Sequence, residues 1–399
     1  MTQATHPQNP DVQLLDGDFY ARGPHPTFDW MRAHAPVYWD AAGQVWGVTR
    51  HADVMRVSKD PETFCSRFGS RPDSPQIPSM INLDDPQHRR RRNLVNRGFT
   101  PRRVEDHAIQ IREVCVDLVE RARERGSFDF VREVAAPLPM IMIGDMLGVA
   151  PEDRDDLLRW SDDMVRGTSI TAPPEVMEAA GRAFAEYTAY NRGVVADRRA
   201  RPLQEDLISV LVHAEIDGER LDDEELLQES LLILVGGDET TRHVITGGMH
   251  QLLLHSDQHQ KLLDDPSLVP GAVEEMLRWV SPIQNMCRTA TRDAELGGET
   301  IREGQKLLLL YPSANRDEAV FDDPHRFEIA RRPNDHVAFG GYGAHFCLGA
   351  SLARLELRIL FEELLRRMPR LELITDAPLP MRSSNFITGI EEMPVRVAE

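Results

Sequence analysis

A long stretch of helical periodicity, residues 223 to 254, restricts the fold more than any other feature of this 399-residue chain. Apolar residues recur along it at a period near 3.6. Asp222 and Glu225 stand at its start with the spacing of a capping box. At 1.5 Å per residue the helix would be about 48 Å long, which is enough to cross a whole large domain. The sequence therefore predicts a central helix around which the other elements pack.

The middle of this predicted helix carries residues that an ordinary structural helix avoids. They are Gly236, Gly237, Asp238, Glu239, Thr240 and Thr241. Each glycine costs about 1 kcal/mol relative to alanine, and a buried acid with two hydroxyl groups adds a cost of desolvation. One interpretation is a satisfied polar patch in a core helix. The combination favours the other interpretation, a local opening of the helix beside a reaction centre that needs protons.

A glycine-rich loop from 338 to 349 is the second unusual segment. Its four glycines within twelve residues exclude a regular helix or strand. Leu348, Leu352, Leu355 and Ile359 follow at helical spacing. Cys347 is therefore expected at a helix start, where the helix dipole favours a thiolate. One cysteine is too few for a zinc site, but it can be the single axial ligand of a haem iron. A buried structural cysteine is the alternative.

This loop resembles the haem-binding loop of the cytochrome P450 family of haem-thiolate monooxygenases, written F-G-x-G-x-H-x-C-x-G. It is one residue longer here, because two glycines separate Phe339 from Tyr342. The resemblance implies that Cys347 is the iron ligand, that His345 is a partner of a haem propionate, and that Gly349 closes the cofactor loop. Phe339 is then the candidate for covering the proximal face of the haem.

Basic residues elsewhere match the family's propionate-binding positions. His88 and Arg92 are four residues apart, so they lie on one face of a helix and could reach one carboxylate. This spacing resembles the family's H-x-x-x-R clamp, and Arg288 resembles a further propionate-binding arginine. The arginines at 89–91 are interpreted as a solvated helix face. Alternatively, with those at 102–103, they form a cationic surface where an acidic electron donor docks.

The same resemblance gives the central helix a role in dioxygen activation. Glu239 and Thr240 match the family's acid–alcohol pair, and Asp238 precedes them as a further catalytic candidate. A peroxide-driven haem enzyme would share the cysteine loop, but it typically lacks this pair. A haem sensor or carrier would need neither the pair nor an apolar pocket.

Periodicity predicts a mainly α chain, with β structure limited to short pieces such as 36–39 and 44–48. The resemblance implies the cytochrome P450 fold, a triangular helical prism around a buried haem with one long central helix. Glu275, Arg278 and Arg326 match the family's structural network under the haem. Since no linker divides the chain, we expect a disordered N-terminus at 1–12 and a single domain at 13–399.

Composition limits the partners and the location. A formal net charge of -19 argues against nucleic acid and anionic membranes as partners. No apolar run approaches the ~18 residues of a membrane span. Four scattered cysteines without a signal peptide indicate the cytoplasm. The resemblance implies haem b as cofactor, with electrons from NAD(P)H delivered by a separate ferredoxin and ferredoxin reductase, since no reductase module is present.

The candidate pocket lining is apolar and lacks lysine and arginine, which favours a large apolar small molecule as substrate. The lining residues are Met80, Ile81, Leu234, Val235, Gly236, Ile283, Asn285, Met286, Phe386 and Ile387. Finer resemblance at 80–86, 94–100 and 236–243 is to the actinobacterial P450s that hydroxylate the terminal carbon of the cholesterol side chain. Steroid side-chain oxidation is therefore the expected reaction, with fatty acyl chains or another secondary metabolite as the alternative substrates.

Overall fold

The computed structural model describes residues 7–72, 78–167, 172–215 and 218–398. Half of the segment expected to be disordered, residues 1–6, lies outside these ranges. From Asn9 onward the chain packs on the fold, because the Tyr38 hydroxyl donates to the Asn9 carbonyl at 3.2 Å and Val12 is buried.

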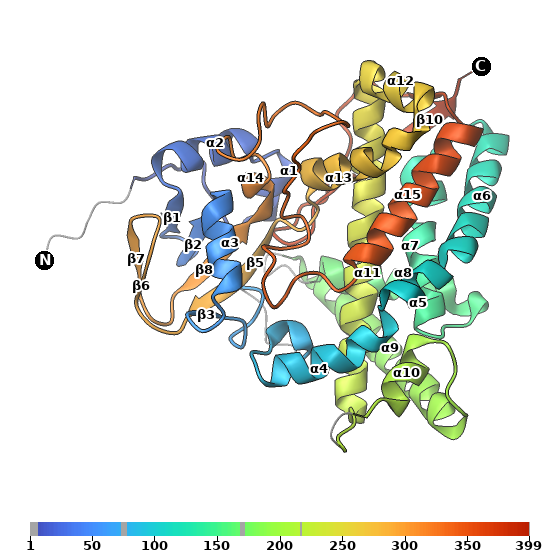
Figure 1. The fold of residues 1–399 in the computed structure, drawn as a ribbon, viewed down its shortest axis with the longest axis horizontal. Coiled ribbons are helices and arrows are strands. Elements are labelled where there is room, and N and C mark those ends of the chain that lie inside the picture. The colour runs from blue at the N-terminus through green and yellow to red at the C-terminus, as the bar shows by residue number, and fades with distance from the viewer. Residues whose placement is uncertain (1–6, 73–77, 168–171, 216–217, 399) are drawn as a thin grey trace, which may run out of the picture.

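Helices form most of the molecule (Figure 1). The α-helices are α1 (Gly17–Ala21), α2 (His25–His34), α3 (His51–Lys59), α4 (Gln87–Val95), α5 (Pro101–Asp106), α6 (Ala108–Arg125), α7 (Pro137–Met146), α8 (Arg154–Arg166), α9 (Pro174–Ala200), α10 (Leu207–His213), α11 (Asp223–Leu254), α12 (Ser256–Asp264), α13 (Val269–Val280), α14 (Tyr311–Ala314) and α15 (Ala350–Arg367). A short 3-10 helix, η1 (Met80–Asn82), precedes α4.

The β structure is small and lies mainly to one side of the helices (Figure 1). The strands are β1 (Val37–Asp40), β2 (Val45–Val48), β3 (Phe64–Cys65), β4 (Ser127–Asp129), β5 (Asn285–Ala290), β6 (Ala294–Leu296), β7 (Glu299–Ile301), β8 (Lys306–Leu310), β9 (Leu371–Leu373) and β10 (Pro394–Val397). The largest sheet has the order β1-β2-β8-β5-β3, in which only β2 and β8 are parallel. This sheet fixes β5, the strand that carries Arg288.

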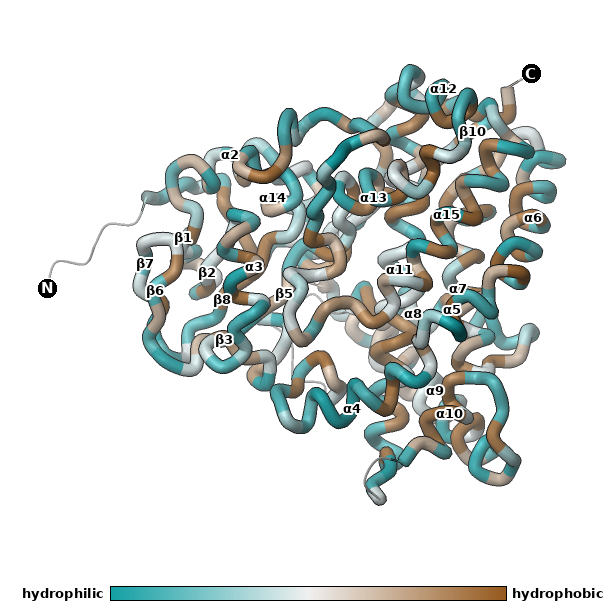
Figure 2. The backbone as a smooth tube through the Cα atoms, viewed as in Figure 1, coloured by the Kyte–Doolittle hydropathy of each residue, from teal (hydrophilic) through white to brown (hydrophobic). Residues whose placement is uncertain are grey.

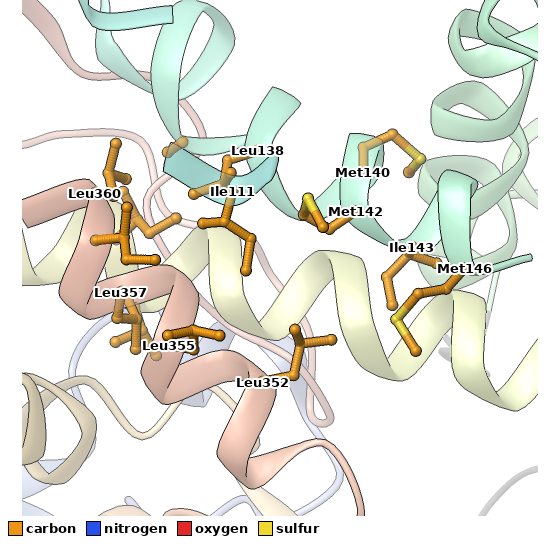
Figure 3. Close-up of a cluster of buried hydrophobic side chains, with 14 of the residues drawn as sticks. Ile111, Leu138, Met140, Met142, Ile143, Met146, Leu352, Leu355, Leu357 and Leu360 are labelled. Carbon is orange, nitrogen blue, oxygen red and sulfur yellow. The ribbon is translucent and has the colours of Figure 1, made fainter. Parts of the chain in front are cut away.

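The long central helix is confirmed as α11, with the predicted bounds and cap. The Glu225 N–H donates to the Asp222 carboxylate at 2.8 Å, and the Asp222 N–H donates to the Glu225 carboxylate at 3.1 Å. Figure 3 shows apolar side chains from α7 and α15 meeting over this helix, among them Ile143 and Leu352. These contacts bury the helix on several sides.

The two glycines in the middle of α11 serve different purposes. A Cβ on Gly237 would lie 2.3 Å from the Ile143 side chain, so this glycine allows α7 to pack closely. A Cβ on Gly236 would meet nothing within 4 Å. The opening predicted from both glycines is therefore a property of Gly236 alone.

Helical periodicity in the sequence predicts a helix at about 127–147, but the first half of this segment is not α-helical. Residues 127 to 129 form β4, which pairs with β10 at the other end of the chain. A π-helical turn at Val131–Ala135 follows before α7 begins. Pairing with a strand so distant in sequence overrides local helical periodicity.

Hydrophobic and hydrophilic residues alternate along most of the helices (Figure 2). The tube is hydrophilic along much of α4, which contains four consecutive arginines. Among the residues that the structure describes, no helix is both long and apolar enough to cross a membrane.

Candidate active site

The glycine-rich loop is held in shape by its own backbone. The Cys347 N–H donates to the Phe339 carbonyl at 3.0 Å, and α15 begins three residues later with Gly349 as its N-cap. Gly340 and Tyr342 both have positive φ, at 94° and 56°. A Cβ on Gly343 would lie 1.8 Å from a backbone oxygen of α3, so only glycine fits there.

Cys347 is the one free cysteine with an exposed side chain among the described residues, since the others (Cys65, Cys115 and Cys287) are buried. Surrounding protein raises the pKa of its thiol by desolvation. The backbone N–H groups of Gly349 and Ala350 and the guanidinium of Arg92 act in the opposite direction. A metal ion bound to the sulfur would remove the proton outright. The sulfur is thus accessible at a helix start, where backbone N–H groups partly offset the desolvation that raises its pKa.

A group of cation-forming side chains surrounds one side of the loop. The rings of His88 and His345 lie 4.1 Å apart between centroids. Burial, together with the charges of Arg288, His88 and Arg92, lowers the pKa of His345 to about 2. The buried Nε2 of His88 has no hydrogen-bond partner among the described residues. Ser66, which the sequence did not suggest, shares a hydrogen bond of 3.1 Å with His345 Nε2.

These observations fit a haem. Within the described ranges neither Arg92 nor Arg288 forms an ion pair with a carboxylate, so these two guanidinium groups can neutralise two propionates. The Arg92 guanidinium also donates to the Phe346 carbonyl at 2.5 Å, which ties it to the cysteine loop. Gly236 and Gly349 both have open space where a Cβ would stand. A single accessible thiolate with these neighbours is the donor set of a haem-thiolate site.

Phe339 packs beneath the loop rather than standing free. The guanidinium of Arg354 lies 4.6 Å from its ring centroid, and the Phe346 ring lies 6.3 Å away in an edge-on arrangement. Its role in covering the haem stays a prediction.

The two members of the predicted acid–alcohol pair have different surroundings. The Thr240 hydroxyl donates to the Gly236 carbonyl at 2.8 Å. Glu239 is fully buried, and its carboxylate accepts from Arg242 at 2.7 Å and from Arg382. These partners and His243 hold the pKa of Glu239 well below its usual range. The acid is therefore an ionised carboxylate held by arginines, a feature that the sequence did not reveal.

Asp238 occupies the opposite flank of α11 from Thr240. Burial and the charge of Glu239 raise its pKa well above the usual range. Glu356 of α15 is its neighbour, and burial together with Asp238 raises the pKa of Glu356 to about 8. Both carboxyl groups are thus shifted toward their neutral forms, and a catalytic role for Asp238 stays a prediction.

The predicted pocket residues divide by accessibility. Ile81, Val235, Gly236, Ile283, Met286 and Phe386 have accessible surface, whereas Met80, Leu234 and Ile387 are buried. Ile283 and Ile387 form an isolated β-bridge that joins two of the predicted pocket segments.

The prediction that Asn285 lines the pocket is corrected by the structure. Side chains alternate along a strand, so Asn285 and Met286 of β5 cannot face the same side. The Asn285 side chain is fully buried and donates to the Asn385 carbonyl at 2.8 Å and the Tyr20 hydroxyl at 3.2 Å. Arg71 donates to its Oδ1 at 2.9 Å.

The pocket lining was expected to lack arginine, but Arg71 packs against one of the predicted lining residues. Its guanidinium lies 4.4 Å from the Phe386 ring centroid and donates to the Asn385 side-chain oxygen at 3.0 Å. Arg71 stands in an irregular segment with no periodicity, so no sequence signal indicated its position.

The predicted structural network contains Glu275 and Arg278 but not the Arg326 side chain, which is exposed. Arg278 donates twice to the Glu275 carboxylate at 2.7 Å, and both side chains are fully buried. Arg331 is the further charged partner, at 3.2 Å from Glu275. Arg326 contributes only its carbonyl, which accepts from Arg278 at 3.2 Å.

The structure also corrects the interpretation of one arginine at 89–91 as part of a solvated helix face. Arg89 is largely exposed and pairs with Asp85, as expected. Arg91, however, is only 13% exposed and pairs with Glu225 and Glu229 of α11.

Comparisons with known proteins identify the family of this chain. The Cytochrome P450 family model matches residues 259–392. The chain is 52% identical over 387 residues to a steroid C26-monooxygenase of Mycolicibacterium smegmatis, covering 97% of this chain and 96% of that protein. It is 38% identical over 407 residues to a methyl-branched lipid omega-hydroxylase of Mycobacterium tuberculosis, covering 96% and 94% of the two chains.

Among solved structures, a Mycobacterium marinum cytochrome P450 in complex with pseudoionone superposes with a TM-score of 0.90 at 34% identity, covering 98% of this chain and 100% of that one. The chain belongs to the cytochrome P450 family. The predicted fold class is confirmed, and family membership brings a haem-iron cofactor and electrons from NAD(P)H through redox partners.

Proposed function

We propose that this chain is a monooxygenase that oxidises the terminal side-chain carbon of a steroid such as cholesterol or cholestenone. The 52% identity to a steroid C26-monooxygenase over 97% of the chain is the observation that carries this proposal. One oxygen atom of O2 enters an unactivated C–H bond. The other leaves as water, after two electrons and two protons have been supplied.

Cys347 is the iron ligand in this proposal, and His88, Arg92, Arg288 and His345 hold the propionates. Haem, when bound, supplies the binding and activation of dioxygen. The accessible sulfur and the two arginines, Arg92 and Arg288, that have no carboxylate partner within the described ranges support these assignments. One domain from residue 13 to 399, located in the cytoplasm, is part of the same proposal.

Thr240 is the residue that passes a proton toward the reaction centre. Its hydroxyl is already oriented by the Gly236 carbonyl, at the point where α11 has open space. Glu239 sets the local charge, because Arg242 and Arg382 keep it ionised. A ferredoxin and its reductase deliver the electrons.

Titration of the ferric enzyme with cholest-4-en-3-one tests the substrate. We expect a low-to-high-spin shift, because a bulky apolar ligand displaces water from the metal, and a Kd in the micromolar range or below, about -8 kcal/mol. Turnover with ferredoxin, reductase and NAD(P)H should then give the terminal side-chain alcohol or acid. Peroxide alone, without redox partners, should give little product.

A branched fatty acid serves as the comparison ligand, since the similarity to a methyl-branched lipid omega-hydroxylase makes it the second candidate. Tighter binding and faster oxidation of that ligand, with no steroid product, would reassign the substrate and leave the monooxygenase proposal in place.

Replacing Thr240 by alanine is expected to uncouple the reaction. Haem and steroid binding should survive, while product formed per NAD(P)H falls by at least about tenfold because proton positioning is lost. The ratio of product to NAD(P)H consumed, together with peroxide release, is the measurement. The neighbouring Thr241→Ala is the control, since Thr241 is buried on another side of α11. Normal coupling in Thr240→Ala would remove the proton-transfer role.

A further inference from the structure

Glu229 lies on the face of α11 that carries Gly236 and Thr240. It precedes Gly236 by seven residues and Thr240 by eleven. At 100° per residue both separations return to within about 20° of the same direction. At 1.5 Å per residue Glu229 is about 10 Å from Gly236 and about 16 Å from Thr240 along the helix axis. The face of α11 that carries Thr240 therefore also carries the carboxylate of Glu229.

This carboxylate holds the turn that carries two of the predicted pocket residues. The backbone N–H of Met80, the first residue of η1, donates to Glu229 Oε1 at 2.7 Å. Met80 and Glu229 are both buried, and Ile81 follows with accessible surface. The bond joins segments 149 positions apart in the sequence, so it fixes η1 against α11.

Arg91 of α4 completes the contact. One guanidinium nitrogen donates to Glu229 Oε1 at 3.2 Å and to the Pro78 carbonyl at 2.5 Å, immediately before η1. The other donates to Glu225 Oε1 at 2.5 Å, one turn earlier on α11. Arg91 and Glu229 thus attach the start of η1, at Met80, and the preceding segment, at Pro78, to α4 and α11. These four residues with Glu225 form what we call the η1 anchor.

A carboxylate is a costly choice for this position. Burial raises the pKa of Glu229 to about 7, although Arg91 and the Met80 N–H act in the opposite direction. Its second oxygen, Oε2, has no hydrogen-bond partner among the described residues. A neutral glutamine could accept from Met80 N–H without the desolvation cost of a charge. An ionisable group therefore stands where a neutral acceptor would satisfy the same backbone N–H.

We propose that Glu229 is a positioning residue for substrate binding, which fixes η1 and so sets the pocket wall formed by Met80 and Ile81. The inference rests on the proposed function, since it concerns the affinity for that substrate. Glu229 need not touch the substrate. Its expected signature is a change in substrate affinity and spin state with little change in the rate of oxidation at saturation.

Hydrogen exchange of the backbone amides at 79–83 tests the contact without any substrate. In Glu229→Leu the Met80 amide should exchange at least about tenfold faster, because its acceptor is gone. Glu225→Gln is the matched control. It weakens the ion pair between Arg91 and residue 225 but leaves the acceptor of the Met80 N–H in place. Glutamine also preserves the capping box. Exchange in this control should stay within about twofold of wild type. The carbon monoxide spectrum of each reduced variant checks that haem is retained.

Steroid titration of the same proteins tests the consequence for binding. The Kd of cholest-4-en-3-one should rise about tenfold in Glu229→Leu, with kcat within about twofold of wild type. Glu229→Gln should recover most of the amide protection, since its carbonyl oxygen can accept from Met80. Unchanged exchange in Glu229→Leu, or equal loss in Glu225→Gln, would overturn the proposal. If the wild type did not bind the steroid, the proposed substrate would be wrong. The hydrogen-exchange comparison would still show whether Glu229 fixes η1.

The pH dependence separates a charged anchor from a simple packing contact. The groups that face Glu229 are Arg91 from α4, Glu225 from α11 and the Met80 N–H from η1. Glu229 is ionised above pH 7 and gains a proton below it, where the attraction to Arg91 is lost. Steroid Kd in the wild type should therefore rise as pH falls from 8 to 6. It should stay flat over this range in Glu229→Gln, and a parallel profile in both proteins would contradict the charged anchor.

Discussion

Replacing Cys347 by serine is expected to abolish turnover, to below about 1% of the wild-type rate, because a hydroxyl cannot supply the electron density of a thiolate to the iron. The reduced carbon monoxide complex should also lose the red-shifted Soret band that marks thiolate ligation. Cys347 is the described cysteine with an accessible sulfur, and it lies at the end of a backbone-bonded loop just before α15. The other three cysteines, Cys65, Cys115 and Cys287, are buried.

Cys65→Ser is the matched control for this variant. Cys65 is buried in β3, whereas the Cys347 side chain is exposed, so the sulfur of Cys65 is not accessible to a metal ion. It should retain the thiolate spectrum and most of the activity. A red-shifted band that persisted in Cys347→Ser would show that the ligand had been assigned to the wrong residue.

The parts of the site that the sequence predicted well are those set by local rules. The capping box at Asp222 and Glu225 defined the start of α11 because both bonds form within one helical turn. The glycine loop was recognisable because positive φ and close approach to α3 need glycine at fixed positions. Four-residue spacing likewise placed His88 and Arg92 on one face of α4.

The parts that the sequence did not predict depend on distant partners. Glu239 is held by Arg382, 143 positions away, and Glu229 is held by Arg91, 138 positions away. Neither arginine differs in its local pattern from the many solvated ones. Asn285 is a different case, because the alternation of side chains along β5 was sufficient to exclude it from the pocket.

The ion-pair network around Glu275 shows how local spacing and distant contacts can point to different residues, and this network matters for stability. Arg326 matched the expected spacing, yet its side chain pairs at the surface with Glu328, and Arg331 takes the buried position. Glu275 is therefore surrounded by two guanidinium groups, and it also accepts from the Asn334 side chain at 3.2 Å and from the Glu328 N–H at 2.9 Å. One carboxylate fixes α13 to the segment from 322 to 334.

Replacing Glu275 by alanine is expected to destabilise the fold strongly. Removing one partner of a buried ion pair typically costs 3–5 kcal/mol, because the remaining charge is buried without compensation. Arg278 would be left in that state, since it is fully buried. With an unfolding entropy of roughly 0.8 kcal/mol/K for a chain of this size, the melting temperature should fall by about 5 °C. Thermal unfolding followed by circular dichroism and by the haem spectrum is the measurement.

Glu372→Ala is the control, because Glu372 pairs with Arg396 at the surface, with both side chains about half exposed. Exposed pairs contribute about 0–1 kcal/mol, so its melting temperature should change by at most about 1 °C. Glu275→Gln should fall between the two, since it keeps the volume and one acceptor oxygen but leaves Arg278 and Arg331 without a counter-charge. A melting temperature of Glu275→Ala equal to that of Glu372→Ala would mean that water or a local rearrangement compensates the buried arginine. The network would then not be what holds α13 in place.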